Sequence, residues 1–258
     1  MKYYYLEILL GGVSGKMAEM VMNKQASEFK KGLQAGLSIA IGYFPIALTF
    51  GLLAKTTGLT LTETVLMSLV VYAGASQYIA LSLISLGTGA FEIILTTFIV
   101  NIRHFLMSAS LNEMCEEDQT KKKVAYSFGI TDETFSVAAT NENNVTTGYM
   151  FGLTIIAYLS WVINSGVGYL LGSALPQTLQ ESMSVALYAM FIGLLVPSLK
   201  KSIKVVLLAV MSASFNTIFT IGEWLSTGWS IVASTLLSAV IIEIVNSFKL
   251  RQGGRGIE

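Results

Sequence analysis

"YAGASQY", residues 72–78, interrupts an apolar stretch that runs from about residue 63 to residue 86. Residues 73–76 are all small, and Gln77 follows them. Small residues let helices approach closely, but such a run also weakens the helix itself. If the helix opens here, its free amides and carbonyls form a substrate site, with Gly74, Ser76 and Gln77 as candidates. The alternative is a tight helix crossing in which Gln77 bonds to a neighbouring helix.

The composition favours a membrane protein. Hydrophobic residues make up 53% of the 258 residues and charged residues only 12%, with a mean hydropathy of +0.65. The formal net charge is zero, so nothing indicates a nucleic-acid partner. The single Cys115 excludes an internal disulfide and makes a cysteine metal site unfavourable. We therefore expect a lipid environment, no cofactor and no metal.

Apolar stretches of about 20 residues are long enough to cross a bilayer. Five such stretches are present, at about 33–54, 63–86, 89–110, 148–172 and 229–247, and two shorter ones lie at about 183–198 and 203–221. An eighth, at 126–140, is short and carries two acids, which predicts a half-helix or broken helix. The predicted fold class is an all-α polytopic membrane bundle of about six to eight transmembrane segments with one or more broken or re-entrant helices.

Lysine and arginine clusters predict the orientation, because they gather on the cytoplasmic side. The clusters are Lys30 and Lys31; Lys121, Lys122 and Lys123; Lys200, Lys201 and Lys204; and Lys249, Arg251 and Arg255. Three apolar stretches separate the first two clusters, although two clusters on one side require an even number of crossings. Either the stretch at 63–86 is re-entrant, or the 121–123 cluster lies outside. Both interpretations place both chain ends in the cytoplasm.

The chain divides into a cytoplasmic leader, a membrane permease domain and a tail. The expected bounds are 1–28 for the leader (with 1–21 as an extension of no assigned role), 29–248 for the permease domain and 249–258 for the cytoplasmic tail. Small residues four apart line two helices: Gly32, Gly36 and Ala40 in the first, and Asn164, Gly168 and Gly172 in another. In lipid such faces predict close helix packing.

Polar groups at membrane depth need partners inside the protein and are candidates for function. Asn101 and His104 share one helix face, whereas Arg103 points about 100° away from His104. Arg103 suits a substrate carboxylate or an internal acid, and His104 suits proton relay. The alternative is that Arg103 and His104 snorkel to the interface near the end of their helix.

Asp132 and Glu133 lie in the short apolar segment "GITDETF". Thr131 is placed to cap a helix that starts after it, with the two acids in a favourable first turn. A buried acid could instead carry a coupling proton, and pairing with Arg103 would neutralise both charges. Pro45 leaves a helix carbonyl unpartnered and bends its helix, either for function or as an ordinary kink.

The sequence resembles the AzlC (azaleucine-resistance) family over about residues 29–248. The motifs that carry the resemblance are "FPIALTFGLLAKTTGLTLTETVLMSLVVYAGASQY" at 44–78, "NIRHFLMSASL" at 101–111 and "GITDETF" at 129–135. The resemblance implies a bacterial inner-membrane permease that exports leucine, isoleucine and valine, with a small hydrophobic AzlD-type membrane subunit as partner.

An amino acid crosses as a zwitterion, so its site must bind a carboxylate and an ammonium together. Arg103, or backbone amides at the break, could bind the carboxylate, and Asp132, Glu133 or exposed carbonyls the ammonium. Val70, Tyr72 and Phe135 are candidate linings for the branched side chain. No phosphate-binding loop is present, so this chain is not itself an ATPase. The leading hypothesis is a secondary exporter of branched-chain amino acids that is driven by the proton gradient. The alternatives are a permease for other small organic solutes, an intramembrane hydrolase using Ser76 and His104, and an assembly subunit without its own pathway.

Overall fold

The computed structural model describes residues 2–141, 145–171 and 202–253, with isolated positions between 172 and 201. This part of the chain is almost entirely helical, and it also contains one isolated β-bridge, between Cys115 and Val145. The helices are α1 (Lys2–Thr56), α2 (Leu61–Val70), α3 (Gly74–Ser85), α4 (Ala90–Met114), α5 (Thr120–Ser127), α6 (Asp132–Ala139), α7 (Thr147–Leu171), α9 (Ile203–Ile221) and α10 (Thr227–Gly253).

Five of these helices are long and apolar enough to span a membrane. They are Ala26–Thr56 within α1, all of α4, α7 and α9, and Thr227–Asn246 within α10. The spans predicted near 33–54, 89–110, 148–172, 203–221 and 229–247 are thus confirmed as helices of spanning length. The stretch at 63–86 is instead two short helices, and most of the stretch at 183–198 lies outside the described residues. The protein is an all-α polytopic membrane protein.

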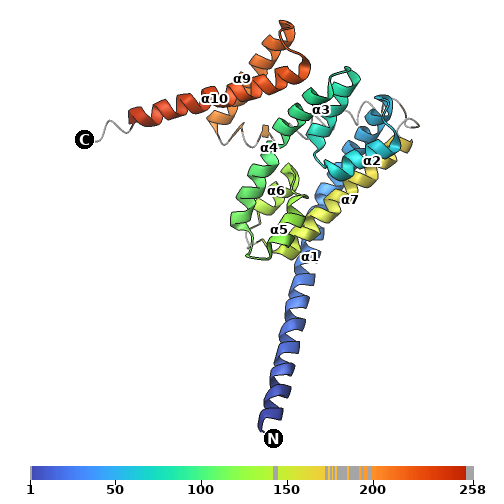
Figure 1. Ribbon diagram of the computed structural model, residues 1–258, viewed down its shortest axis with the longest axis vertical. Coiled ribbons are helices and arrows are strands. Elements are labelled where there is room, and N and C mark those ends of the chain that lie inside the picture. Colours follow the sequence, from blue (N-terminus) through green and yellow to red (C-terminus); the bar gives the residue numbers. More distant parts are fainter. Residues whose placement is uncertain are drawn as a thin grey trace.

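The α1 and α7 helices form the centre of the bundle and run parallel to each other (Figure 1). Gly32 lies on the backbone of Tyr149, near the start of α7, and Leu48 lies on Gly168, near its end. A Cβ atom on either glycine would overlap the backbone of the facing helix. The predicted close packing is confirmed at Gly32, Gly36 and Gly168, while Gly172 lies outside the described residues.

The α2 and α3 helices form an open V whose tip lies inside the bundle (Figure 1). Tyr72, at the tip, has a φ of +42°, which ends the regular helix. The α2 helix descends along the C-terminal half of α7, where Ser68 donates to Ser165 at 2.8 Å. The α3 helix then returns to the start of α4. This apolar stretch is therefore re-entrant, as one of the two interpretations of the sequence required.

The α5 and α6 helices form a second V, which enters from the other end of the bundle. Next to its base, the Glu116 amide donates to the Val145 carbonyl at 3.0 Å, so α4 ends where α7 begins. Asp118 precedes α5 and accepts bonds from the Gln119 amide and Lys122, which lower the pKa of its carboxyl to about 2. At the tip, Thr131 caps α6 as predicted.

Two lysine clusters lie at one end of the bundle, which we call the basic end (Lys30, Lys31 and Lys121–Lys123). Gly32, next to the first cluster, packs at the start of α7, and Lys123 of the second cluster donates to Asn112 near the end of α4. The end of α4 and the start of α7 lie side by side, so the two clusters are at the same end of the bundle. The interpretation that places the 121–123 cluster on the other side is therefore wrong. The segments α1–α2–α3 and α4–α5–α6 share one plan, a span followed by a V, in opposite directions, which is the pattern of inverted-repeat transporters.

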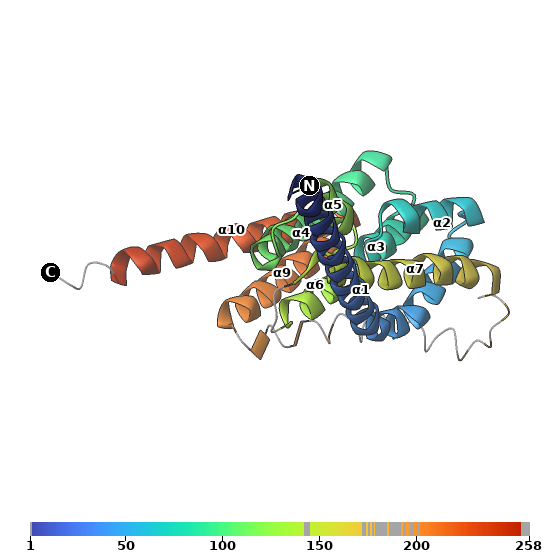
Figure 2. The same ribbon diagram turned by 90° about the horizontal axis from the view of Figure 1, so that it is seen from below.

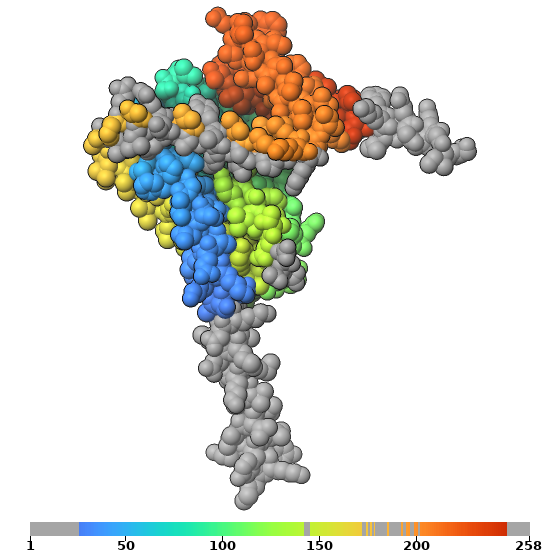
Figure 3. Space-filling view, turned by 180° about the vertical axis from the view of Figure 1, so that it is seen from behind, coloured from blue at the N-terminus to red at the C-terminus, as the bar shows by residue number. Residues whose placement is uncertain are grey.

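The α9 and α10 helices pack on each other and lie on the opposite side of the molecule from α2 and α7 (Figure 2). They meet α4 through Glu92, whose carboxylate accepts bonds from the Ser226 hydroxyl and, at 3.2 Å, from the Trp229 amide. An acid at the start of a helix is favourable there. On the reverse side of the molecule, α1 lies beside α6 (Figure 3), which brings both V tips and two spans around one point.

Candidate functional site

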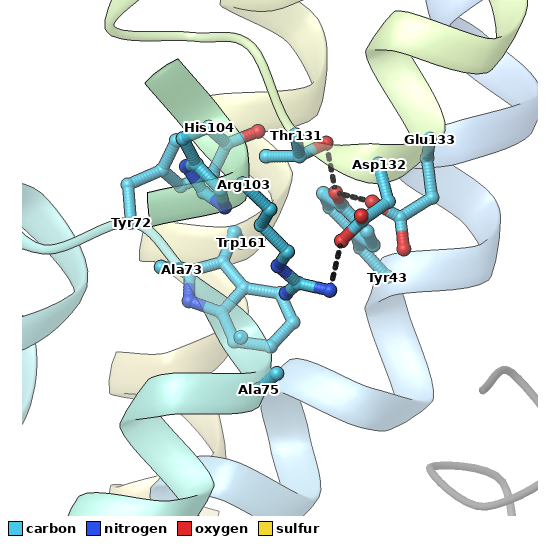
Figure 4. Close-up of a pocket in the computed structure, with 11 residues that line it drawn as sticks. Tyr43, Tyr72, Ala73, Ala75, Arg103, His104, Thr131, Asp132, Glu133 and Trp161 are labelled. Carbon is cyan, nitrogen blue, oxygen red and sulfur yellow. Dashed lines mark hydrogen bonds and ion pairs between the residues drawn. The ribbon is translucent and has the colours of Figure 1, made fainter. Parts of the chain in front are cut away.

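A pocket of about 340 Å³, including the space at its open side, lies between the tips of the two V-shaped pairs (Figure 4). Its lining comes from α1, both tips, α4 and α7: Tyr43, Tyr72, Ala73, Gly74, Ala75, Arg103, His104, Thr131, Asp132, Glu133 and Trp161. The space left free between these side chains holds only about one water molecule. The polar clusters that the sequence places far apart therefore meet at one point, in a narrow state of the pocket.

Arg103 and Asp132 form an ion pair of 2.9 Å across the pocket, between the guanidinium and Oδ2. Their side chains are 34% and 24% exposed, so the pair is neither surface nor fully buried. The predicted pairing is confirmed, and the snorkelling alternative is wrong because Arg103 turns inward to the tip of α6. Arg103 and His104, which are expected to point about 100° apart on their helix, both line this pocket.

Glu133 lies beside this pair but has a different partner. The Tyr43 hydroxyl donates to Glu133 Oε2 at 2.6 Å and lies 2.8 Å from Thr131 Oγ1. Because tyrosine has a single proton, which it gives to the carboxylate, Thr131 donates to the Tyr43 oxygen. Thr131 thus links the α6 cap to the pocket. The two neighbouring acids consequently differ: one is bound to a cation and the other to a neutral hydroxyl.

Both V-shaped pairs direct a helix N-terminus at the pocket, but the two N-termini differ. At α6, Thr131 and Thr134 form a reciprocal capping box that satisfies the first amides. At α3, the N-cap is Ala73, which makes no side-chain capping bond. The first-turn amides of a helix have no partner within it and favour anions. The open end of α3 is therefore suited to an anionic group.

A second observation at the α3 end also indicates a missing ligand. The Tyr72 side chain is 2% exposed and lines the pocket, and its hydroxyl has no hydrogen-bond partner among the described residues. The Nε atom of Arg103 is likewise buried without a partner. Buried polar atoms are normally satisfied, and each unsatisfied one costs about 1–3 kcal/mol. A bound group that accepts hydrogen bonds would satisfy these donors.

Gln77 and Ser76 lie behind the pocket rather than on its wall. Gln77 is fully buried, and its Oε1 accepts bonds from the Ala73 amide at 3.2 Å and from Trp161 Nε1 at 3.0 Å. Its Nε2 donates to Ser68. Both alternatives for this residue thus hold in part, because the helix does break and Gln77 fixes the break to α7. A direct role of Gln77 or Ser76 in transport stays a prediction.

We expect the substitution Gln77→Leu to destabilise the protein, because it leaves the Ala73 amide, the Trp161 indole and Ser68 without this partner. Each lost buried partner costs about 1–3 kcal/mol. Thermal unfolding of the purified protein in detergent should show a clear loss. The matched control is Asn101→Leu, because Asn101 Oδ1 is buried and already unpartnered, so its removal should cost nothing. Equal losses in both variants would contradict this role of Gln77.

Four other predicted residues lie outside the pocket lining, and one of them is Phe135, which packs against the hydrophobic core. Asn101 is one turn from the pocket on α4, and Pro45 lies within α1, where its carbonyl accepts a bond from Thr49. Val70 is 68% exposed and so does not line the pocket, unlike Tyr72. The hydrolase alternative has no geometric support, because the Ser76 hydroxyl donates to the Ala73 carbonyl and does not line the pocket with His104.

Tyr43 and Trp161 are site residues that the sequence analysis missed. Aromatic residues within apolar spans are usually packing residues, and nothing in the span at 33–54 distinguishes Tyr43 from its neighbours. Trp161 did carry a signal: tryptophan gathers at membrane interfaces, whereas this one lies mid-span. In the structure Trp161 contacts Tyr43 edge-on, with ring centroids 5.2 Å apart, and supports the pocket floor.

The chain is similar to several known membrane proteins. It is 31% identical over 206 residues to "Inner membrane protein YgaZ" of Escherichia coli, covering 76% of this chain and 84% of that protein. An "Uncharacterized membrane protein" of Archaeoglobus fulgidus is 32% identical, with 68% and 78% covered. The "Branched-chain amino acid transport protein AzlC" of Bacillus subtilis is 25% identical, with 71% and 74% covered.

No solved structure matches the chain. A family model described as "AzlC protein" matches residues 38–175, which is more than half of the chain. The matched region contains both V tips and every residue that lines the pocket. The chain therefore belongs to the AzlC protein family.

Proposed function

We propose that this protein is a secondary transporter that exports leucine, isoleucine and valine across the bacterial inner membrane. Export is coupled to protons, and a carboxyl in the pocket carries the coupling proton. The family membership and the name of the Bacillus relative support transport of branched-chain amino acids. The single observation that carries the proposal is the pocket, which places anion-binding donors opposite two carboxylates.

The carboxylate of the substrate binds to the open N-terminus of α3, to Arg103 and to the Tyr72 hydroxyl. These groups share one property, which is donor capacity that the protein leaves unused. The ammonium binds to Asp132, which then exchanges part of its contact with Arg103 for the substrate. Such an exchange keeps the charges neutralised at membrane depth, where an isolated charge is costly. The apolar side chain lies against Trp161 and Ala75.

Glu133 is the proposed proton carrier. Its partner is the neutral Tyr43 hydroxyl, so a proton added to Glu133 breaks no ion pair, whereas one added to Asp132 would disrupt the contact with Arg103. His104 lines the same pocket and is a second candidate for proton relay.

The remaining features of the proposal follow from the family resemblance and the lysine distribution. The basic end and both chain ends lie in the cytoplasm, with residues 1–28 as leader and 249–258 as tail. A small hydrophobic AzlD-type membrane subunit is the partner. This partner would pack against an apolar surface of the bundle. The transport test therefore compares cells with and without the partner.

The transport test measures efflux of labelled leucine from cells with and without this chain, with the partner supplied separately. We expect efflux only with this chain, and we expect a protonophore to suppress it. Efflux that is the same without the chain would end the proposal. Resistance to the protonophore would remove proton coupling and leave the substrate assignment.

The proton carrier has its own test. We expect Glu133→Gln to lose proton-driven net efflux but to retain exchange of labelled for unlabelled leucine, because exchange requires no proton step. The matched control is Glu63→Gln. Glu63 closes the capping box of α2 far from the pocket, and glutamine can replace it there. Protonophore-sensitive net efflux by Glu133→Gln would exclude Glu133 as carrier.

A further inference from the structure

A groove of about 660 Å³, including its open space, lies between the C-terminal half of α4 and α5. Its lining begins at the basic end and ends near the pocket: Asn112, Lys123, Ser108, Ser127, Phe105 and Ile130 are among its residues. Polar side chains thus line the groove from the basic end as far as Ser108 and Ser127, although α4 is a membrane span with an exposed apolar surface, and its inner end at Phe105 and Ile130 is apolar. Polar positions on a groove at this depth favour contact with water or a polar solute over contact with lipid.

The groove and the pocket lie end to end. On α4, His104 lines the pocket and the next residue, Phe105, lines the groove. At the tip of the α5–α6 pair, Thr131 lines the pocket and Ile130 lines the groove. The two spaces share no lining residue. Ile130 is 2% exposed and directly precedes Thr131 of the pocket in the chain, so it lies where the two spaces approach each other.

The corresponding approach from the opposite end is more firmly closed. There α2 is fixed to α7 by the Ser68–Ser165 bond and by the Tyr158 hydroxyl, which donates to the Leu69 carbonyl at 2.8 Å. Gln77 adds its bond to Trp161. By contrast, α5 meets α7 through apolar contacts such as that of Tyr126 with Phe151. The bonds that hold the α5–α6 pair include the exposed Lys123–Asn112 bond at the basic end and, at the tip, those of Asp132 to Arg103 and of Glu133 to Tyr43.

We propose that the groove between α4 and α5 is the route by which the substrate reaches the pocket from the basic end, and that Ile130 is the barrier along it. This inference rests on the proposed function, in which the pocket binds an amino acid. Movement of the α5–α6 tip by about one side chain joins the groove to the pocket. Such a movement also brings Asp132 and Glu133 with it, since both belong to the same tip.

Thiol labelling in membrane vesicles tests the route. In a Cys115→Ser background, Ala75→Cys places one thiol in the pocket, and Lys121→Cys in a separate variant marks the basic end. A membrane-impermeant maleimide is applied to vesicles of each orientation. We expect Ala75→Cys to react slowly, and only in the orientation in which Lys121→Cys reacts. Adding Ile130→Ala should raise its rate by about tenfold or more, since loss of a buried side chain weakens closure.

Matched controls separate the barrier from general loosening. Ile39→Ala truncates another buried isoleucine, which lines neither space, and should change the rate less than about twofold. Ser127→Cys in the groove should react without any barrier substitution, whereas Leu106→Cys, on the lipid-facing surface, should not. Equal effects of Ile130→Ala and Ile39→Ala, or reaction of Ala75→Cys from the opposite end alone, would overturn the route.

The same thiol separates the route from the proposed function. Leucine bound in the pocket should protect Ala75→Cys from the maleimide. Absence of protection, together with the expected dependence on Ile130, would count against the amino-acid substrate and support the route. Protection without dependence on Ile130 would support the substrate and overturn the route.

Discussion

Arg103→Gln is expected to reduce leucine efflux by about one to two orders of magnitude while the protein remains in the membrane. The guanidinium donates to Asp132 and has an unused Nε, so it is the strongest anion-binding group in the pocket. A hydrogen bond to a charged group contributes about 1.5–3 kcal/mol, which corresponds to about ten- to hundredfold in binding. Glutamine keeps the length and polarity but not the charge.

Efflux of labelled leucine from cells, normalised to the amount of chain in isolated membranes, measures this effect. Lys121→Gln is the matched control, because it removes an exposed cation at the basic end and should leave efflux unchanged. Unchanged efflux from Arg103→Gln would remove Arg103 from the mechanism.

The contact of Arg103 with Asp132 can be tested separately from the role of Arg103 in transport, by measuring stability instead of efflux. In a double-mutant cycle, Arg103→Gln and Asp132→Asn should destabilise the protein less together than the sum of their separate effects, because each single change leaves one charge unpaired. The coupling should be modest, since the pair is partly exposed and solvent screens it. Additive losses would mean that the two groups do not interact in the folded protein.

Much of the fold was accessible from the sequence because lipid imposes simple rules. Length and apolarity predicted α1, α4, α7, α9 and α10, and the parity of the lysine clusters required either a re-entrant stretch or an outside cluster. The run of small residues at 73–76 then marked the break itself. The sequence left open whether this stretch is re-entrant or the 121–123 cluster lies outside. The answer depends on whether Gln77 has a partner inside the bundle, and that partner, Trp161, is 84 residues away in the chain.

The pocket was predictable only in part, for a similar reason. Arg103, Asp132 and Glu133 were identifiable because ionised groups are rare in apolar spans. Tyr43, Trp161 and Ala75 look like ordinary packing residues, and only the meeting of α1, α4, α7 and the two V tips gives them a place in the site. Helical periodicity separates Arg103 from His104 by about 100°, and it does not show that both residues line one pocket.

Gly168→Ala is expected to destabilise the bundle strongly, although it adds a single methyl group. The Cβ atom would overlap the backbone of Leu48 in α1, so the two helices have to separate rather than adjust a side chain. Overpacking of a closed interface costs about 1–3 kcal/mol and can cost more where backbone must move. Denaturation of the purified protein in mixed detergent micelles should show the loss.

Gly42→Ala is the matched control in the same helix pair. No atom lies within 4 Å of its added Cβ, and alanine favours a helix over glycine by about 1 kcal/mol, so this variant should be as stable as the parent or slightly more stable. If Gly168→Ala and Gly42→Ala behaved alike, α1 and α7 would not be in backbone contact.

The length of this interface gives a further, quantitative expectation for the pair of variants. Gly32→Ala creates the same overlap at the other end, against Tyr149. Gly32 and Leu48 are sixteen residues apart in α1, about 24 Å along a helix. If α1 and α7 tilt locally, the two losses should add in the double variant. If instead the first overlap separates the helices along their whole length, the second substitution should cost little more. The parallel α1–α7 pair would then behave as one cooperative unit that holds both V tips in place.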